Sequence, residues 1–426
     1  MTVSLPSLRA YQERSLAQPD RSVMPVSLPS LRAYHDHSLA RRARSVMPSG
    51  NTRTTVFVPP TPPFAEVGQD AWVIDQLGHR VIDCNNNYTA LIHGHGHPGV
   101  RVAVKAVLET GSAFGLPTSS EVALAEHLTG RTAIKRWRFS NSGTEAVMTA
   151  IRGARAFTGR DLILRFEGSF HGTADAVVDP TAPGIPAAVA SASVVVPQGD
   201  RARFDSAMSE HGDRLAAVII DLMPNRAGLV RADGDFVKHI RAATRDAGAL
   251  MIVDEVITFR LETGGLHKQY GIEPDLITLG KIIGGGFPVG AIGGDREVMA
   301  VFDPLAERLV GWGGTFSANP VSMTAGLVAL ENFRRDEIAR LNALGDSLRE
   351  SLTASGVAVT GYGSLARIRE SVDPKALWWE LYRAGVFAGT NGLLSLSTPM
   401  TDADIRTIAD SVAHAVAATK SKELVS

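Results

Sequence analysis

The chain has 426 residues, and its 43 basic and 44 acidic side chains give a formal net charge of −1. This balance provides no general attraction to nucleic acid or to an anionic membrane, so neither is expected as a partner. The single cysteine excludes an intrachain disulfide and fits a reducing compartment. No apolar stretch approaches the ~20 residues of a membrane span, and the start lacks the apolar core of a signal peptide. We therefore expect a cytoplasmic globular protein of roughly two to three domains.

The first part of the chain contains a repeat. Residues 4–25 recur as residues 27–48, at an offset of 23 residues and with 16 of 22 positions identical. A solenoid needs about three units, so two copies indicate a local duplication or an extended start.

The second copy predicts an amphipathic helix that begins after Ser30, a residue type that caps helix starts. Leu31, Tyr34 and Leu39 would share its apolar face. The basic run at 41–44 could form a nucleic-acid patch, but in a neutral chain we favour a solvated helix face.

Strand and helix patterns alternate along the middle of the chain. Residues 71–84 predict a hairpin that turns at Gly78. Three apolar runs predict buried parallel strands, and a helical pattern separates two of them. The runs are 215–221, 249–256 and 275–281, and the helix is 236–248. This order implies a parallel sheet with helices on both faces, in which ligands collect at the carboxyl ends of the strands.

The C-terminal part of the chain predicts a smaller second domain. Residues 319–356 are mostly helical in pattern. The last ~70 residues predict short strands and a final helix that begins after Thr401.

One of the apolar runs ends in a lysine. The stretch "LITLGKIIGGGFPVGAIGG" places Lys281 between a strand-like segment and glycines. A triphosphate-binding loop needs a glycine five places before Gly280 and Ser or Thr after the lysine, whereas Asp275 and Ile282 stand there. A lysine at the end of a buried strand can instead form a Schiff base with a carbonyl, because burial lowers its pKa. The glycines at 284–286 would let the backbone pass close to a flat ligand.

A Schiff-base cofactor such as pyridoxal phosphate needs a phosphate cradle, an acid on its ring nitrogen and a group on its ring face. A helix start offers amides and a positive helix end to an anion. The candidates are Ser142, Gly143 and Thr144 for the phosphate, Asp254 for the ring nitrogen, and Phe170 with His171 for the ring face. Each also has a plainer interpretation: "SGT" is an ordinary helix cap, Asp254 could end its strand in a turn, and Phe170 alone is more typical of a core.

Five motifs in this order resemble those of the class III (subgroup II) aminotransferases of pyridoxal-phosphate fold type I. They are "FSNSGTEA", "SFHG", "IVDEV", "LGKIIGGG" and "GGTFSANP". The likeness is greatest to β-amino-acid (β-phenylalanine) aminotransferases and to glutamate-1-semialdehyde 2,1-aminomutase, and it runs from about Arg44 to the C-terminal helix.

The resemblance implies an α/β fold with two domains. A large domain with a mostly parallel central sheet would span 96–325 and bind pyridoxal 5'-phosphate. A smaller α+β domain would combine an N-terminal segment, 27–95, with a C-terminal one, 326–426. Residues 1–26 would then be a supernumerary, flexible copy of the repeat, because the second copy leads into the family's substrate loop.

The resemblance also implies roles for single residues toward the cofactor. Lys281 would carry it as a Schiff base and move the proton between substrate and cofactor. Asp254 would pair with the ring nitrogen, and Val256 would pack under the ring. Ser142, Gly143 and Thr144 would hold the phosphate.

Two further implied residues concern the partner subunit and the substrate. Thr315 would reach the phosphate of the neighbouring subunit, so the resemblance implies a homodimer with shared active sites. Arg53 matches an arginine that binds a substrate carboxylate in the β-amino-acid enzymes, for which the guanidinium offers a bidentate fork.

The chain departs from the family pattern at three places. Phe170 stands where the family usually has tyrosine, and Asp221 followed by Leu222 stands where it usually has Glu-Pro. Asn391 stands where the β-phenylalanine enzymes have a mobile arginine. Asp221 and Asn391 are thus candidate substrate contacts, and the change at Asn391 puts the usual acceptor, 2-oxoglutarate, in doubt.

The histidine-rich run "HGHGHP" at 93–98 could suggest a metal site, because alternate histidines on a strand share a face. The family carries a similar loop, so we favour a structural role and expect no metal site.

Three functions stay open. The first is a ping-pong aminotransferase for a β-amino acid or a related carboxylate-bearing amine. The second is an aminomutase of the glutamate-1-semialdehyde type, which moves the amine within one molecule. The third is a non-catalytic binding or regulatory protein with this fold, which would have lost the lysine site and gained a DNA-binding domain.

Overall fold

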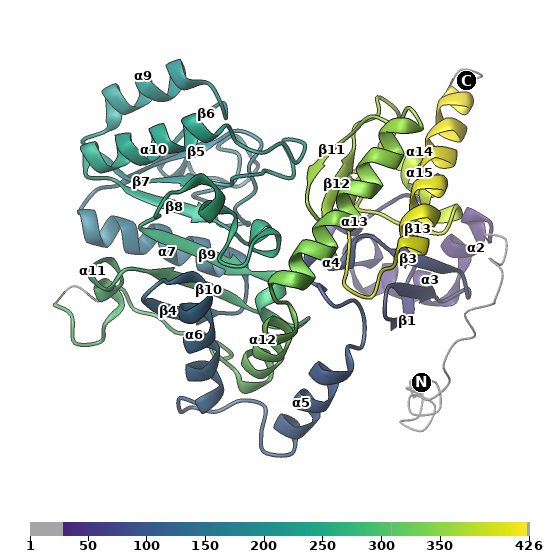
Figure 1. Cartoon of the computed structure of the whole chain (residues 1–426), viewed down its shortest axis with the longest axis horizontal. Coiled ribbons are helices and arrows are strands. Elements are labelled where there is room, and N and C mark those ends of the chain that lie inside the picture. Colours follow the sequence, from purple (N-terminus) through teal and green to yellow (C-terminus); the bar gives the residue numbers. More distant parts are fainter. Residues whose placement is uncertain (1–28, 308, 424–426) are drawn as a thin grey trace.

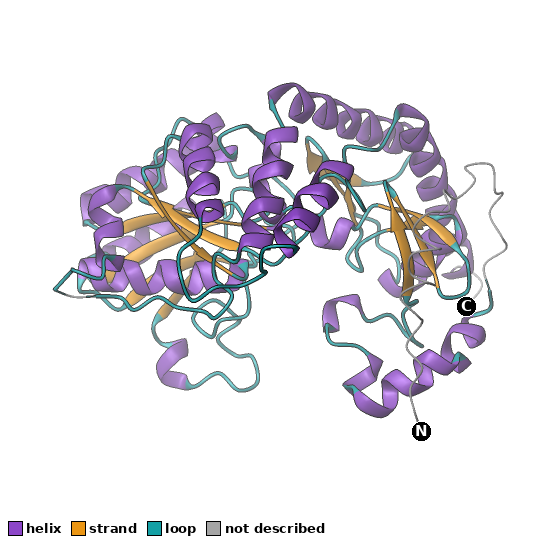
Figure 2. Ribbon diagram, turned by 90° about the horizontal axis from the view of Figure 1, so that it is seen from below, coloured by secondary structure: helices purple, strands orange, loops and turns teal. Residues whose placement is uncertain are grey.

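The computed structural model of the chain describes residues 29–307 and 309–423. A larger group of elements surrounds a seven-stranded sheet, and a smaller group beside it holds two short sheets and the C-terminal helix (Figures 1 and 2). The first copy of the repeat, predicted to be flexible, lies outside the described residues. Within the described part, no helix is both long and apolar enough to cross a bilayer.

The large sheet is mostly parallel, as predicted. Its strand order is β4-β10-β9-β8-β7-β5-β6, and only β10 runs antiparallel to its neighbours. The three predicted parallel strands are confirmed as β7, β8 and β9, which lie side by side. The strands are β4 (Arg136–Ser140), β5 (Leu162–Phe166), β6 (Ser193–Val196), β7 (Leu215–Ile220), β8 (Leu250–Asp254), β9 (Leu276–Gly280) and β10 (Gly290–Gly294).

Helices cover both faces of this sheet because successive strand residues point to opposite sides. On one face, Leu164 of β5 packs in a cluster with Phe236 of α10. On the other face, the neighbouring Ile163 packs with Ile151 of α7. The helices of this group are α5 (Pro98–Leu108), α6 (Ser119–Thr132), α7 (Gly143–Thr158), α8 (Ala187–Ala190), α9 (Arg201–His211), α10 (Gly234–Ala247), α11 (Arg296–Met299) and α12 (Pro320–Asn332).

The smaller group combines both ends of the described chain. The predicted hairpin is confirmed: β2 and β3 pair around Gly78, whose φ is +83°. Strand β13 from the C-terminal part adds to β3 in parallel, so the two chain segments share one sheet. The predicted domain boundaries stay predictions. The elements are β1 (Ala65–Gln69), β2 (Trp72–Asp75), β3 (Arg80–Asp83), β11 (Val359–Tyr362), β12 (Leu365–Ile368), β13 (Val386–Phe387), β14 (Leu393–Ser395), α13 (Arg335–Ala354), α14 (Pro374–Arg383) and α15 (Asp402–Glu423).

The predicted helices of the C-terminal part are confirmed. Helices α12 and α13 occupy the predicted helical stretch, and α15 is the final helix. The amide of Asp404 donates to Thr401 Oγ1 over 3.3 Å, so Thr401 caps α15 as expected.

The predicted single helix of the second repeat copy is wrong. The segment forms two helices, α2 (Leu31–Asp36) and α3 (Ser38–Val46). His37 between them has an extended ψ of 140°, and its Nδ1 accepts the amide of Leu39, so this residue starts a second helix. The Ser30 cap is confirmed by a 3.2 Å hydrogen bond from the amide of Ala33.

The second copy is anchored by the buried Tyr34, against whose cluster Leu31 packs, and by the buried Ala40 and Ala43 of α3. The hydroxyl of Tyr34 donates to Asp75 Oδ2 over 2.7 Å, and the hydroxyl of Tyr382 donates to the same oxygen over 3.0 Å. Burial raises the pKa of both tyrosines, and Asp75 raises it further. Leu31 and Leu39 are only half-buried. The second copy is therefore part of the folded body.

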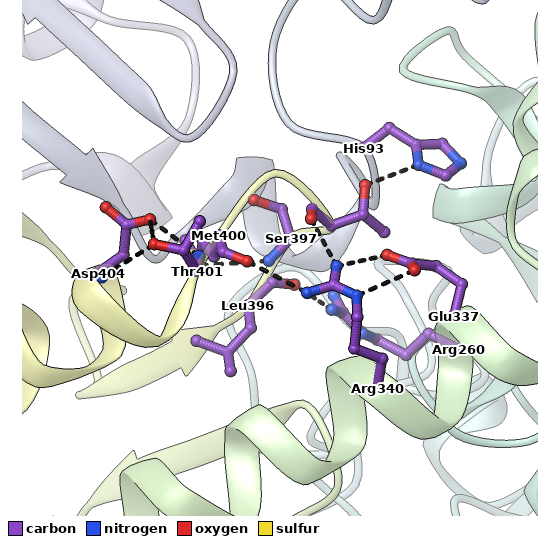
Figure 3. Close-up of polar contacts among 10 residues, drawn as sticks. His93, Arg260, Glu337, Arg340, Leu396, Ser397, Met400, Thr401 and Asp404 are labelled. Carbon is purple, nitrogen blue, oxygen red and sulfur yellow. Dashed lines mark hydrogen bonds and ion pairs between the residues drawn. The ribbon is translucent and has the colours of Figure 1, made fainter. Parts of the chain in front are cut away.

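Two arginines fix the segment that leads into α15 (Figure 3). Arg340 of α13 donates to the carbonyl oxygens of Thr398 at 2.6 Å and Met400 at 3.3 Å. Arg260 is fully buried and donates to the carbonyl oxygen of Leu396. Because Arg260 follows β8 of the large sheet, this contact joins the two groups of elements.

Candidate active site

A cavity of about 340 Å³ opens at the carboxyl edge of the large sheet. The segments after β4, β5, β7, β8 and β9 all reach it, as expected for a parallel sheet. All the site residues predicted from the sequence line this cavity, except Thr315 and Asn391. Those that line it are Arg53, Ser142, Gly143, Thr144, Phe170, His171, Asp221, Asp254, Val256 and Lys281.

Lys281 directly follows β9 and has a φ of 52°. This left-handed conformation is uncommon for a residue with a side chain, and it costs on the order of 1–3 kcal/mol. Burial lowers the pKa of the Lys281 amine, while Asp254 and Asp221 oppose that shift. The lysine that follows β9 thus lines the cavity with an amine whose pKa lies below that of an exposed lysine.

Asp254 ends β8 and is buried, with both of its carboxylate oxygens in defined contacts. Oδ1 accepts a hydrogen bond from the amide of Val256 over 3.0 Å, so Asp254 does end its strand in a turn, as its plainer interpretation predicts. Oδ2 lies 2.7 Å from Nδ1 of His171. The other ring nitrogen of His171, Nε2, is buried and has no protein partner in the described part of the chain. His171 therefore orients the carboxylate that faces the cavity.

Asp221 follows β7 and adds a second buried carboxyl to the same cavity. Burial raises its pKa to about 7, and the neighbouring charge of Asp254 raises it as well. Its Oδ1 accepts the amide of Met223 over 2.9 Å. Asp221 therefore exchanges a proton near neutral pH beside Lys281.

The start of α7 has amides that could bind an anion, whereas its hydroxyls make contacts within the local fold. The Ser142 hydroxyl accepts the amide of Glu145 over 3.2 Å, so Ser142 is also an ordinary helix cap. The Thr144 hydroxyl accepts the amide of Thr173 over 3.3 Å. The first amides of a helix have no partner within it, and the helix dipole adds positive potential there. A glycine is favoured at position 143 because a Cβ there would lie only 3.0 Å from the Val256 methyl groups.

Two of the three glycines after Lys281 do not face the cavity, so that part of the prediction is wrong. A Cβ on Gly284 would lie 2.5 Å from Val289 Cγ1. Gly285 has a φ of +58°, and a Cβ there would lie 2.3 Å from the carbonyl oxygen of Ala325. Only Gly286 lines the cavity. The first two glycines allow close packing against α12 and the start of β10.

Phe170 lines the cavity with 37% of its surface exposed, so it is not a core residue. Gly172, two residues on, has a φ of +98° and lies against Thr144. The loop after β5 is thereby held against the start of α7. Phe170 is available as a flat apolar wall.

Asn87 is a site residue that the sequence analysis missed. Its Oδ1 accepts a 2.7 Å hydrogen bond from Nη1 of Arg53, and both residues line the cavity. Residues 86–89 all have positive φ, from 48° to 75°, so the chain makes one left-handed turn here. Such backbone is strained for residues with side chains and persists where its surroundings enforce it.

The left-handed turn is enforced from the preceding strand end. Asp83 Oδ1 accepts the amides of Asn85 at 2.9 Å and Asn86 at 2.7 Å, and Asn85 Oδ1 accepts the amide of Tyr88 at 2.8 Å. The three consecutive asparagines at 85–87 could have indicated this turn in the sequence, because asparagine tolerates left-handed backbone better than most residues.

Thr315 and Asn391 lie outside this cavity. Thr315 is exposed and borders a separate hollow with the loop at 113–118. Asn391 Nδ2 donates to Asn225 Oδ1 over 3.4 Å. Neither side chain lines the cavity that holds Lys281 of its own chain.

The histidines of the 93–98 run each have a structural contact. His93 lies 2.9 Å from Thr398 Oγ1 and 2.8 Å from the carbonyl oxygen of Ala329. His95 lies 2.8 Å from Asp83 Oδ2, and His97 caps α5. These contacts support the structural interpretation of the run.

Residues 56–416 match the family model of the class-III aminotransferases. The chain belongs to this family. It is 40% identical to a glutamate-1-semialdehyde 2,1-aminomutase of Aeropyrum pernix, over 73% of this chain and 76% of that protein.

Solved structures of a transaminase and an aminotransferase also resemble this one. An omega-transaminase from Sphaerobacter thermophilus superposes with a TM-score of 0.88 and 40% identity, covering 91% of this chain and 99% of that one. A β-phenylalanine aminotransferase from Variovorax paradoxus superposes with a TM-score of 0.84 and 32% identity, covering 92% and 96%. The predicted family, fold type, enzyme class and pyridoxal-phosphate cofactor are confirmed. Transaminases and aminomutases both occur among the matches, so the names alone do not choose between them.

Proposed function

We propose that this class-III aminotransferase transfers the amine of a carboxylate-bearing substrate, such as a β-amino acid, in a ping-pong mechanism. One observation carries the proposal: Lys281, Asp254 and Arg53 line a single cavity. The three supply an amine, a carboxylate and a guanidinium, which are the groups that hold a carbonyl cofactor and an anionic substrate. The similarity to an omega-transaminase and a β-phenylalanine aminotransferase supports this substrate class.

The cavity residues fit pyridoxal phosphate. The amides at the start of α7 suit its phosphate, and Asp254, fixed by His171, suits its ring nitrogen. Val256 and Phe170 offer apolar contacts for a flat ring. When bound, this cofactor supplies an electron sink for the substrate carbon that bears the amine.

The protein's own groups would then move protons and position the substrate. Lys281 Nζ can accept the proton from the substrate carbon and return it, and burial, which lowers its pKa, favours this role. Asp221 can hold or release a proton beside it, since its pKa is about 7. Arg53, oriented by Asn87, would bind the substrate carboxylate.

The protein would work as a homodimer. Thr315 lies apart from the cavity of its own chain, as required if it completes the phosphate site of a neighbour. Large apolar side chains near it are exposed: Phe114 and Leu116, which line the same hollow, and the adjacent Phe316, with Leu116 at 77%. A second copy of the chain would cover them.

An aminomutase that moves the amine within one molecule is the second candidate. The 40% identity to a glutamate-1-semialdehyde 2,1-aminomutase favours it. A non-catalytic role has less support, because Lys281, Asp254 and their neighbours are all present.

A donor screen with the purified holoenzyme tests the proposal. We expect a carboxylate-bearing amine to shift the visible cofactor absorbance, and a keto acid to restore it. Lys281→Ala should lose the covalent attachment of the cofactor and this cycle, whereas the exposed control Lys238→Ala should keep both. Isomerisation of one substrate without any acceptor would favour the aminomutase instead.

A further inference from the structure

Arg226 carries an unpaired charge next to the cavity. Its guanidinium carbon lies 4.1 Å from the centroid of the Phe170 ring, and Phe170 lines the cavity. Arg226 is exposed, and within the described chain no acidic side chain forms an ion pair with it. Stacking on an aromatic face holds a guanidinium in place while its N–H groups stay available to an anion.

The backbone that carries Arg226 is fixed on two sides. On one side, Arg367 of β12 donates to the carbonyl oxygen of Asn225, and Asn391 donates to the Asn225 side chain. On the other side, a Cβ on Gly168 would lie 2.8 Å from Ala227, so the loop before Phe170 packs directly against this segment. Arg226 therefore has a defined position between the loop after β5 and the turn at Asn391.

The surroundings of Arg226 are positively charged. Arg367 and Arg369 lie on β12 and just after it, and Arg369 approaches Gly228 of the same segment. Among the described residues, neither of these two arginines has an acidic ion-pair partner either. Arg367 and Arg369 line a separate hollow that also includes Asn391. Guanidinium groups without a paired acid attract anions and raise their local concentration.

We propose that Arg226 binds the second carboxylate of a dicarboxylic substrate or acceptor, the one farther from the reacting carbon. This inference rests on the proposed aminotransfer and names a substrate class for the same site. Asn391 stands where the β-phenylalanine enzymes have a mobile arginine, and it contacts Asn225, the residue next to Arg226. Arg226 would therefore supply a cation close to the position where that arginine is missing. This reverses the expectation that 2-oxoglutarate is a poor acceptor.

Binding of unreactive acids to the holoenzyme tests this directly. Glutarate carries two carboxylates, and butyrate is its one-carboxylate match. In calorimetric titrations of the wild-type protein, we expect glutarate to bind more tightly than butyrate. Arg226→Gln should weaken the binding of glutarate by about two- to fivefold, which corresponds to the upper part of the range of about 0.2–1 kcal/mol for an exposed charged pair, and leave the binding of butyrate unchanged. Arg226→Lys should retain part of the preference, because it keeps the charge without the planar fork.

The matched control is Arg406→Gln, which removes an exposed arginine from α15 and should change neither affinity. In turnover, Arg226→Gln should raise the KM for 2-oxoglutarate by a similar factor and leave that for pyruvate unchanged. Equal affinities of the wild type for glutarate and butyrate, or equal losses of both in Arg226→Gln, would overturn the inference. If the wild type transfers nitrogen to no acceptor, the proposed function fails, while the two binding titrations still decide the role of Arg226.

Discussion

His171 Nδ1 and Asp254 Oδ2 lie 2.7 Å apart, and both side chains are buried beside the cavity. A buried carboxylate that loses its hydrogen-bond donor loses on the order of 1.5–3 kcal/mol. We therefore expect His171→Phe to weaken binding of pyridoxal phosphate by about ten- to hundredfold, since Asp254 would no longer be oriented toward the ring nitrogen.

Equilibrium dialysis of the cofactor measures this effect. His171→Gln keeps an N–H donor and should recover part of the affinity, which mere loss of packing would not explain. His414→Gln, at an exposed position of α15, is the control. Unchanged cofactor affinity in His171→Phe would show that Asp254 needs no such support.

Asp221 predicts a pH dependence of stability. Its pKa is raised from 3.8 to about 7 in the folded protein, mainly by burial and next by Asp254. Between these two values the folded protein binds more protons than the unfolded chain, so stability falls as pH rises from about 4 to about 7 and then levels off. At 1.36 kcal/mol per pH unit, this contribution is at most about 4 kcal/mol.

Urea unfolding of the cofactor-free protein at pH 5, 6, 7 and 8 checks this dependence. Asp221→Asn keeps an acceptor for the amide of Met223 and removes the titration. The free energy of unfolding of the wild type, relative to that variant, should decline up to pH 7 and stay constant above it. A difference that rises with pH would contradict the raised pKa.

Much of the cofactor site was predictable because it depends on chain order. The carboxyl ends of parallel strands meet at one edge of a sheet, so Asp221, Asp254 and Lys281 had to converge once their strands were recognised. The motif order then placed Ser142 and Phe170 at the same edge. Strand order together with the family resemblance of the motifs was sufficient for these residues, whereas each local pattern alone had a plainer interpretation.

The substrate side of the site depends on contacts that no local pattern reveals. Asn87 reaches Arg53 because four residues take left-handed backbone. Asp83 holds this conformation by accepting backbone amides, and Asn86 holds it by donating to the carbonyl oxygen of Ser395. Arg226 likewise meets Phe170 across two loops that are distant in sequence. The break at His37 was missed for a related reason: a side-chain cap outweighed the helical periodicity.

Arg53 and Asn87 should act as a pair in substrate binding. Arg53→Ala removes the guanidinium and should raise the KM for a carboxylate-bearing donor by about ten- to hundredfold, with little effect on cofactor affinity. Asn87→Ala leaves the Arg53 guanidinium in place but removes the hydrogen bond that orients it. A smaller rise in the KM, of about three- to tenfold, is therefore expected.

A double variant distinguishes this pair from two independent contacts. If Asn87 acts through Arg53, adding Asn87→Ala to Arg53→Ala should have little further effect on KM. An amine without a carboxylate serves as control, because neither change should affect its use. Fully additive effects would assign Asn87 a separate role.

The two copies of the repeat should differ in their contribution to stability. Deleting residues 2–26 should leave folding and activity nearly unchanged, because the second copy keeps the contact between Tyr34 and Asp75. Tyr34→Phe should instead destabilise the protein by about 1.5–3 kcal/mol in urea unfolding, since a buried carboxylate loses one of two hydroxyl donors. Loss of solubility on deletion would show that the first copy also supports the fold.

Thr315 and the exposed apolar residues near it predict that an isolated subunit has an incomplete phosphate site. We expect light scattering to report a dimer or a larger assembly for the holoenzyme. Leu116→Asp places a charge among side chains that a second copy would cover, and it should shift the protein toward monomer. Cofactor affinity should fall together with the dimer fraction as the protein is diluted.

Thr315→Ala should lower cofactor affinity while the dimer persists, which separates a direct phosphate contact from an effect of assembly. A monomer that retains full cofactor affinity would refute the shared site.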